Sequence, residues 1–384
     1  MDIIGNIVGY FEEVETTEEY EGYWYSVANI IVIAILGSLC GLKNMILIAE
    51  WAKSKAVTEF LQRKMKIPRV PCYSQFTNIM GIINSESLNE AFIKWIGSIV
   101  EASGKTIAID GKTIRSTEKM SGYESPIHIV SAYISELRVT IGQLAAEGKG
   151  DEIGTVQELI GMLELSGALV VADALNCQRK TCKDILEAGA DYLLCIKRNQ
   201  ARTFEEIKSH IHDETNAENI EKAKTVEKNG GRIETRTAHV SYDIEHLKNA
   251  RKWPGLSCFG AIRRQVEING VTTDEWSYYI SSRKLTAQDF LKNVRFEWGV
   301  ESMHWLLDVL FDEDKTRVLN ENTQLNLNII RKIALNLISD FKKETQSKKP
   351  ISGIMRSCLF DVDFLDDFIH ALAYHKLLNN LLPN

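Results

Sequence analysis

Two short apolar segments, each leading into an aspartate, most constrain what this chain can fold into. The first is 106–110, which ends at Asp110 and is followed by Gly111, and the second is 168–172, which is followed by Asp173. Runs of this length and composition predict buried strands, and the glycine predicts a sharp turn. Rigid strands can hold two carboxylates close together, and a divalent cation makes their repulsion tolerable. The pattern therefore predicts a metal site where two strands end.

A third carboxylate, Glu301, lies within a strongly helical stretch, 298–305. Two aspartates on strands and a glutamate on a helix indicate a nuclease or transposase core. Each residue also has a simpler interpretation, because an aspartate after a strand can cap a turn and a helical glutamate is commonly solvated. The residue types alone leave both interpretations open.

Composition is that of a globular protein with several domains. The chain has 384 residues, of which 45% are hydrophobic, enough for two or three ordinary cores. Its seven cysteines are scattered without a C-x-x-C pair, which argues against a zinc ribbon or a disulfide framework and favours a reducing cytosol. The net charge of −7 argues against a general nucleic-acid coat protein. A DNA enzyme with clustered basic residues remains compatible with that charge.

The first part of the chain, 1–102, is expected to form a helical domain with a possible role in binding DNA ends. The apolar stretch 26–42 is interrupted by Gly37, Ser38, Gly41 and nearby Lys43, whereas a membrane span needs about 20 apolar residues. We therefore expect a buried helix there and no membrane insertion. Helical spacing continues over 45–66 and 73–99. These helices could form a helix-turn-helix or serve only as packing units.

The pattern changes to strands after residue 102. Strands are predicted at 106–110, 128–134, 138–144, 168–172 and 192–196, with helices at 153–165 and 178–187. Three meandering strands joined to two parallel ones predict the α/β, mixed-sheet core of a ribonuclease-H-like fold. The strand-helix-strand part alone would also suit a doubly wound fold. No G-x-G-x-x-G follows any strand, which argues against a dinucleotide-binding version.

A β-rich insertion is predicted over 200–283, after a polar helix that ends near His212. Its alternating, β-branched runs are broken by Asn229-Gly230-Gly231 and Asn269-Gly270, which are hairpin signals. Helical spacing returns at 286–310 and 325–337. The expected organisation is a catalytic core at 103–199 and 284–345, interrupted by the insertion and followed by a C-terminal helical tail at 346–384.

A series of short motifs runs in order along most of the chain. They are AIDGKTIR (108–115), HIVSA (128–132), ADALNCQ (172–178), GADY (189–192), KRNQ (197–200), GRIETR (231–236), WPGL (253–256), YYISS (278–282), WGVE (298–301), HW (304–305), LDV (307–309), ED (313–314) and ALNL (334–337). On these motifs the chain resembles the DDE transposases of the ISAs1 group, including the H-repeat-associated proteins. Each motif is weak alone, but their number and order make the resemblance specific.

The resemblance implies a ribonuclease-H-like core in which Asp110, Asp173 and Glu301 are catalytic metal ligands. Two Mg²⁺ or Mn²⁺ ions are expected, with Asp110 bridging both ions and the other two carboxylates binding one each. Such enzymes cut double-stranded DNA at transposon inverted repeats and join the freed 3′-hydroxyl to target DNA. They usually act as dimers on paired ends, in the bacterial cytosol. A transposase-derived DNA-binding protein without turnover, or a nuclease that cuts without joining, are the alternatives.

The chain also departs from the pattern that the resemblance implies. The broader group carries a tyrosine, an arginine and a lysine around the glutamate, where this chain has Val294, Glu297 and Asp308. Arg198 stands where a glycine is expected, and Asn176 and Ser302 are further differences.

Several supporting residues each have a functional and a structural interpretation. Contact with DNA phosphate is predicted for Lys112, Lys197, Asn199, Gln200, Arg232 and Arg236, against loop, cap or ion-pair roles on a solvated surface. His304 follows Glu301 by one helical turn, where it could shuttle a proton or support a metal ligand from outside; a packing or hydrogen-bonding role is the preferred interpretation. Trp298 and Trp305 are expected to pack on the core face of their helix rather than stack on a base.

Overall fold

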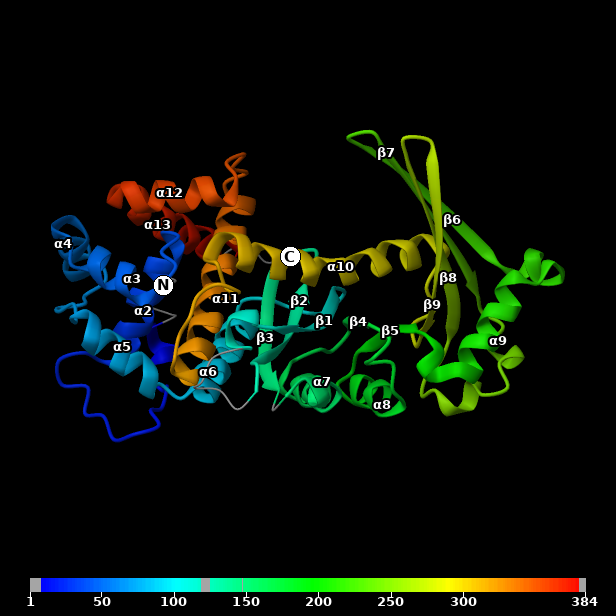
Figure 1. Ribbon diagram of the computed structural model, residues 1–384, viewed down its shortest axis with the longest axis horizontal. Helices are drawn as coiled ribbons and strands as arrows, with labels where there is room; N and C mark the ends of the chain where they lie inside the picture. Colours follow the sequence, from blue (N-terminus) through cyan, green and yellow to red (C-terminus); the bar gives the residue numbers. More distant parts are fainter. Residues whose placement is uncertain (1–7, 119–124, 147, 380–384) are drawn as a thin grey trace.

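In this computed structural model, residues 8–118, 125–146 and 148–379 are described, and they form an elongated molecule built around one sheet. A cluster of helices made from both ends of the chain lies at one end of the sheet, and a pair of long β-hairpins lies at the other (Figure 1). The nine strands follow the order β3-β2-β1-β4-β5-β9-β8-β7-β6. The predicted insertion is therefore a continuation of the core sheet.

Five strands form the core of the sheet. They are β1 (Thr106–Thr113), β2 (His128–Ile134), β3 (Val139–Ala146), β4 (Leu169–Ala172) and β5 (Asp191–Ile196). Strands β1, β2 and β3 pair antiparallel, whereas β4 lies parallel to both β1 and β5. Every residue of β2 and β4 is buried, as expected for strands covered on both faces. This is the predicted ribonuclease-H-like mixed sheet.

The strand β1 is longer than predicted. It continues through Gly111 to Thr113, paired with β2 over its whole second half, so the prediction of a sharp turn at the glycine is wrong. Asp110 therefore lies within the strand, beside Ser131 of β2. The glycine has another explanation, which is the close approach of side chains from two other elements.

Four strands of the insertion extend the sheet beyond β5. They are β6 (Glu221–Asn229), β7 (Arg232–Ser241), β8 (Cys258–Ile268) and β9 (Val271–Ser281), all antiparallel, with β9 paired to β5. Both predicted hairpins are confirmed. Gly230 and Gly231 have φ of 53° and 82°, and Asn269 and Gly270 have φ of 50° and 78°. Two successive residues with positive φ are what a tight hairpin needs, and glycine and asparagine tolerate that backbone best.

One long helix crosses both parts of the sheet (Figure 1). Helix α10 (Ala287–Phe311) packs on β1, β2 and β4 of the core and on β6 and β7 of the insertion. At 1.5 Å per residue its 25 residues span roughly 37 Å, enough to reach across several strands. Helix α7 (Glu152–Met162) packs on β2 and β3, α8 (Arg179–Glu187) packs on β5, and α9 (Ala201–His212) packs on β8 and β9. Helix α10 thus couples the insertion to the core.

The helical end combines the first and last parts of the chain. Its members are α2 (Val27–Leu39), α3 (Met45–Ala52), α4 (Lys55–Arg63), α5 (Tyr73–Ile82), α6 (Ser85–Gly97), α11 (Glu321–Glu344), α12 (Ile351–Phe360) and α13 (Val362–Asn379). Helix α11 contacts α2, α5 and α6 on one side and α12 and α13 on the other. The N-terminal helices and the C-terminal tail therefore share one central helix.

Two long helices predicted near the N-terminus are each divided. The stretch 45–66 breaks at Ser54 between α3 and α4, and 73–99 breaks before Asn84, between α5 and α6. Asn84 accepts hydrogen bonds from the backbone of Glu86 and Ser87, so it caps a new helix instead of continuing the old one. In the described residues, no helix has both the length and the apolar character that crossing a membrane requires. All seven cysteines are free thiols, and all but Cys72 are buried.

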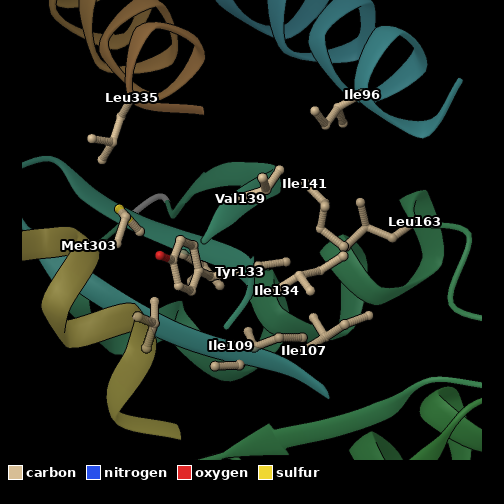
Figure 2. Close-up of a cluster of buried hydrophobic side chains, with 14 of the residues drawn as sticks. Ile96, Ile107, Ile109, Tyr133, Ile134, Val139, Ile141, Leu163, Met303 and Leu335 are labelled. Atoms are coloured by element: carbon tan, nitrogen blue, oxygen red, sulfur yellow. The ribbon is translucent and has the colours of Figure 1, made fainter. Parts of the chain in front are cut away.

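The main hydrophobic core forms where these layers meet (Figure 2). Side chains from two helices of the helical end, three strands of the core and α10 contribute to it, together with Leu163. The residues drawn include Ile96, Ile107, Ile109, Tyr133, Val139, Ile141, Met303 and Leu335. Met303 is fully buried, as are Val300 and Leu307 on the same helix. These three side chains fix the rotation of α10 about its axis, which leaves Glu301 exposed on another face.

Candidate active site

The two aspartates are brought together by the pairing of β1 with β4. These strands are parallel, and Ile109 lies opposite Ala172. The next residue on each strand is an aspartate, Asp110 or Asp173, so the sheet presents two carboxylates side by side. Parallel strands end at the same edge of a sheet, and ligand sites commonly form at that edge.

Burial raises the pKa of Asp110 to about 7. The backbone N–H of Gly111 opposes this shift, and the negative charges of Asp173, Glu152 and Glu301 add to it. Like charges that share a site with little solvent disfavour ionisation of each other. The third predicted carboxylate, Glu301 of α10, therefore lies close enough to act on Asp110.

Helix α10 contributes a further carboxylate that the sequence analysis noted only as a departure from the family pattern. Glu297 lies one helical turn before Glu301 and is half-buried. Burial, followed by the charges of Asp173, Asp110 and Glu301, raises its pKa to about 8, against the opposing charge of Lys197. The spacing of four between two glutamates on one helix was the available signal for this pair.

These groups suit a hard divalent cation. Every side chain named around Asp110 offers carboxylate oxygen, the donor that Mg²⁺ and Mn²⁺ prefer. A bound cation would reverse the electrostatic penalty that raises the pKa of Asp110 and Glu297. The residues present therefore fit the kind of ion that the sequence predicts.

His304 lies beside Asp110, with its Nδ1 atom 3.7 Å from the Oδ2 atom. That separation is too long for a hydrogen bond. Burial lowers the pKa of His304 well below its ordinary value, and the positive charges of Lys332 and Lys112 add to this, so the ring is neutral. Its Nε2 atom has no hydrogen-bond partner among the described residues. A role for His304 in supporting the metal ligands stays a prediction.

The loop after Asp173 is held by a set of amides. The Oδ1 atom of Asp173 accepts hydrogen bonds from the backbone N–H of Leu175 and Asn176, at 3.0 and 3.2 Å. Asn199 donates its side-chain amide to the carbonyl of Ala174 at 2.6 Å, and Gln200 donates to the carbonyl of Cys177 at 3.1 Å. The two predicted DNA contacts thus brace this loop, in keeping with the loop-and-cap interpretation. Lys197, just before them, is exposed.

Lys112 lies in a network of ion pairs. Its Nζ atom is 2.6 Å from Asp308 and 2.8 Å from the buried Glu313. The broader group that this chain resembles has a lysine at the position of Asp308. In this chain the positive charge of the pair is Lys112 on β1, and the negative charge is Asp308 on α10. The predicted phosphate contact would require Lys112 to leave these partners.

Arg232 and Arg236 alternate along β7, and Glu234 lies between them on the same face. Their guanidinium groups are 2.6 and 2.5 Å from its carboxylate, and Arg264 of β8 is 2.7 Å away. The ion-pair interpretation of these arginines matches this arrangement, and their contact with DNA stays a prediction.

The two tryptophans of α10 do not pack in the core as expected. Trp298 and Trp305 are 50% and 61% exposed. The core face of the helix is carried by Val300, Met303 and Leu307 instead. Because Trp298 precedes Glu301 by three residues and Trp305 follows it by four, both rings flank that carboxylate on one exposed face.

Glu152, which acts on Asp110 from the start of α7, was not among the predicted site residues. The predicted helix began one residue too late, at Ile153. A glutamate in the first turn after a predicted strand was a signal that this carboxylate reaches the same edge of the sheet. His128, at the start of β2, contacts it with Nε2 2.9 Å from Oε2.

Comparison with known proteins gives a consistent result. Residues 101–337 match the family described as "Transposase DDE domain", and residues 8–96 match one described as "DDE_Tnp_1-associated". The chain is 30% identical to "Putative protein YbfL" and 29% identical to "H repeat-associated putative transposase YhhI", both from Escherichia coli K12. Each match covers 92% of this chain and 96% of the relative. It is also 33% identical to "Putative transposase YncI" of Escherichia coli O157:H7, over 71% of this chain and 72% of that protein.

Proposed function

This chain belongs to the family of transposases with a DDE domain, and from that premise we propose that it cuts DNA at transposon ends and joins the freed 3′-hydroxyl to target DNA. Asp110, Asp173 and Glu301 would hold the divalent cations. The single observation that carries this assignment is the parallel pairing of β1 with β4, which brings Asp110 and Asp173 together at one edge of the sheet. The preferred ion is Mg²⁺, with Mn²⁺ as a substitute.

When bound, such cations activate the attacking water or 3′-hydroxyl and stabilise the departing oxygen of a phosphodiester. The contribution of the chain is to place the ligands before substrate arrives. Strands β1 and β4 fix the two aspartates, and the buried side chains of α10 fix the direction of Glu301. Asn199 and Gln200 keep the loop after Asp173 in place. Burial lowers the pKa of His304, so its neutral ring lies beside Asp110 without competing with the cations for that carboxylate.

The exposed face of α10 supports a DNA duplex as the substrate. Trp298 and Trp305 offer flat apolar surfaces on either side of Glu301. Aromatic rings of this kind are stacking platforms for unpaired bases, which a duplex exposes where its end opens. Lys197 lies exposed near Glu297 and would bind phosphate as a positive charge.

A second surface supports binding of the DNA end away from the carboxylates. A cleft of about 1110 Å³ lies between the N-terminal helices and the segment before α11. Basic and amide side chains line part of it, including Lys43, Asn44, Lys315, Arg317 and Asn320. Helices α3 and α11 both begin at this cleft, capped by Asn44 and Asn320, and helix N-termini favour phosphate. We assign it to duplex DNA outside the cleavage point.

An in vitro cleavage and joining assay tests the proposal. The substrate is a duplex carrying the inverted repeats that flank the gene, incubated with full-length protein and Mg²⁺ or Mn²⁺. Wild type should nick the ends and join them to target DNA, and Asp110→Asn should reduce the rate by about 10³-fold or more. Full activity in Asp110→Asn would refute the ligand assignment. Cutting without joining indicates a nuclease, and binding without cutting indicates a DNA-binding derivative. The mass of the DNA complex reports whether two chains hold paired ends.

A further inference from the structure

Glu152 connects several elements around the two aspartates. It is the first residue of α7, and its Oε2 atom lies 2.9 Å from Nε2 of His128. The other nitrogen of that ring lies 2.9 Å from the hydroxyl of Thr113 on β1. The imidazole is thus fixed on both sides, and it fixes the glutamate. The other oxygen, Oε1, accepts a hydrogen bond from the side-chain amide of Asn176 at 3.1 Å.

Gly111 makes this arrangement possible. A Cβ atom at position 111 would lie 2.4 Å from Nε2 of His128 and 2.7 Å from Oε2 of Glu152. Atoms cannot approach so closely, so any side chain there would displace both residues. The glycine after Asp110 therefore leaves the space in which a fifth carboxylate, Glu152, reaches the centre. This accounts for a glycine at a place where the strand continues without a turn.

Asn176 links the side chains of Glu152 and Asp173 through hydrogen bonds. Its amide nitrogen donates both to Oε1 of Glu152 and to Oδ1 of Asp173, each at 3.1 Å. Asn176 is fully buried, so its amide has no alternative in solvent. With the two backbone donors, three hydrogen bonds converge on Oδ1 of Asp173, and none of them goes to Oδ2. Outer partners of this kind set the orientation of metal ligands.

We propose that Glu152 is a positioning residue of the carboxylate centre, which holds Asp173 through Asn176 and adds negative charge that favours cation binding. This inference rests on the proposed function. It requires that Glu152 sets the affinity for the cation, and not only the stability of the fold.

Direct measurement of Mn²⁺ binding to the full chain tests this role without an activity assay. Glu152→Gln keeps the size of the side chain and removes its charge, so the dissociation constant for Mn²⁺ should rise about 10- to 100-fold, as for other second-shell changes. Glu158→Gln is the matched control, because Glu158 lies exposed on the same helix and should bind Mn²⁺ as wild type does. Asp110→Asn should lose binding at this centre.

The outcomes separate the two proposals. Unchanged Mn²⁺ affinity in Glu152→Gln overturns the positioning role, and so does a lowered unfolding midpoint with unchanged affinity, which indicates a structural role alone. If Asp110→Asn also binds as wild type, the metal centre itself is misassigned and the proposed function fails with it. Weakened binding in Glu152→Gln and Asp110→Asn, with a normal Glu158→Gln, supports both.

A separate group of side chains on the insertion carries a second inference. His210, near the end of α9, faces Asp243 and His246 in the connection that follows β7. One ligand atom from each of these three residues lies within 4.8 Å of the others. His210 is buried, whereas the other two are exposed, and the imidazole centroids are 4.5 Å apart. Two nitrogens and one carboxylate oxygen thus lie close enough together to share one ion, and two of the three residues are open to solvent.

This donor set differs from that of the carboxylate centre. Imidazole nitrogen with one carboxylate suits Zn²⁺ or a similar transition metal, whereas Mg²⁺ prefers oxygen alone. The hydroxyl of Ser241 lies 3.0 Å from Nε2 of His210 and accepts a hydrogen bond from the backbone of Asp243 at 3.2 Å. Ser241 therefore links two of the three residues and orients the buried ring. The nitrogen left for an ion is Nδ1 of His210, from which an ion would displace the side-chain amide of Asn216, now 3.4 Å away.

The geometry points to a transition-metal site at His210, Asp243 and His246 that joins α9 to the end of β7. A Zn²⁺ ion there would cross-link two segments of the insertion and would leave one position open for water. The competing explanation is that the two imidazole rings simply pack edge to face, which involves no ion.

Titration of the full chain with Co²⁺, in excess Mg²⁺ to occupy the carboxylates, tests this site. Wild type should show the visible absorption of a nitrogen-ligated ion, and Zn²⁺ should displace it. His246→Ala and Asp243→Asn, at exposed positions, should weaken Co²⁺ binding about tenfold or more. His370→Ala is the control, because His370 pairs with Asp366 alone and should change nothing. Absence of this absorption in wild type, or equal binding by wild type and His246→Ala, overturns the site.

Discussion

Asp110 and Glu234 are carboxylates in the same sheet with opposite electrostatic surroundings. Around Glu234, burial raises the pKa, but the hydrogen bond from Arg264 and the charges of Arg236, Arg264 and Arg232 bring it below its ordinary value. Around Asp110, burial raises the pKa to about 7 and the neighbouring charged groups are further carboxylates. In the insertion, three arginines neutralise the negative charge of Glu234. At the core end of the sheet, the positive charge that neutralises Asp110 would come from a bound cation.

A third carboxylate shows that this difference is local. Glu313 is completely buried, yet the charges of Lys112 and Arg331 lower its pKa. The chain can therefore neutralise a buried acid in the core as well as in the insertion. The acidic cluster around Asp110 differs from Glu234 and Glu313, because its neighbouring charges are negative. For this reason we assign a bound cation to it. The predictions below test this contrast.

The largest expected change in stability is at Glu234, whose charge is neutralised by three arginines. Glu234→Gln leaves three arginines around an uncharged group, and breaking the ion pairs of this buried carboxylate should lower the free energy of unfolding by about 3 kcal/mol. Urea unfolding of the purified protein measures this change. A loss near zero would show that the arginines are well solvated, and the contrast with Asp110 would then fail.

At Asp110, removal of the carboxylate charge is expected to raise the free energy of unfolding instead of lowering it. The pKa of Asp110 in the folded protein, about 7, lies above the ordinary value of 3.8, so the folded state binds more protons between those limits. The stability of the metal-free protein therefore falls as pH rises from about 4 to about 7. Asp110→Asn removes this penalty and should stabilise the metal-free protein by roughly 1–3 kcal/mol above pH 7, with the gain vanishing near pH 4.

Thermal unfolding in chelator at pH 4 and pH 8 checks this prediction. Addition of Mg²⁺ at pH 8 should raise the midpoint of wild type and leave that of Asp110→Asn nearly unchanged. A variant that is less stable than wild type in chelator at pH 8 would contradict the charge assignment.

Helix α10 joins the core and the insertion, and a smaller effect, on DNA affinity, is expected from a substitution on its exposed face. Trp305→Ala should weaken binding of a labelled terminal-repeat duplex by about 1 kcal/mol or more, roughly fivefold or more in Kd, if the ring stacks on a base. Trp305→Phe keeps an aromatic surface and should retain most of the affinity. Fluorescence anisotropy measures both, and equal Kd values for Ala and wild type would remove Trp305 from the DNA surface.

The smallest effect is expected at an exposed ion pair of the insertion. Arg263 and Asp274 face each other across β8 and β9, where both are accessible to solvent. Asp274→Asn should leave the urea midpoint unchanged within error, because solvent screens such pairs. If its effect matches that of Glu234→Gln, burial does not explain the strength of the arginine cluster.

Local sequence patterns predicted the strands, the hairpins and the two aspartates. Alternation and apolar runs specify β2 and β4, and asparagine–glycine pairs specify the hairpins, because both depend only on neighbouring residues. Helix ends were less accurate, since Ser54 and Asn84 divide stretches whose apolar spacing is continuous. The prediction that Trp298 and Trp305 pack in the core was wrong for a similar reason. Spacing alone does not say which face of a helix meets the core.

The sequence by itself determined the order of strands and helices and the candidate ligands Asp110, Asp173 and Glu301, because periodicity and turn chemistry are local properties. Only the tertiary structure decided which charges are balanced. Lys112 meets Asp308 across 196 residues of chain, and Glu152 reaches Asp110 through the space at Gly111. A pKa depends on every charge and every buried atom within a few Å, and their positions follow from packing between segments that are distant in the chain.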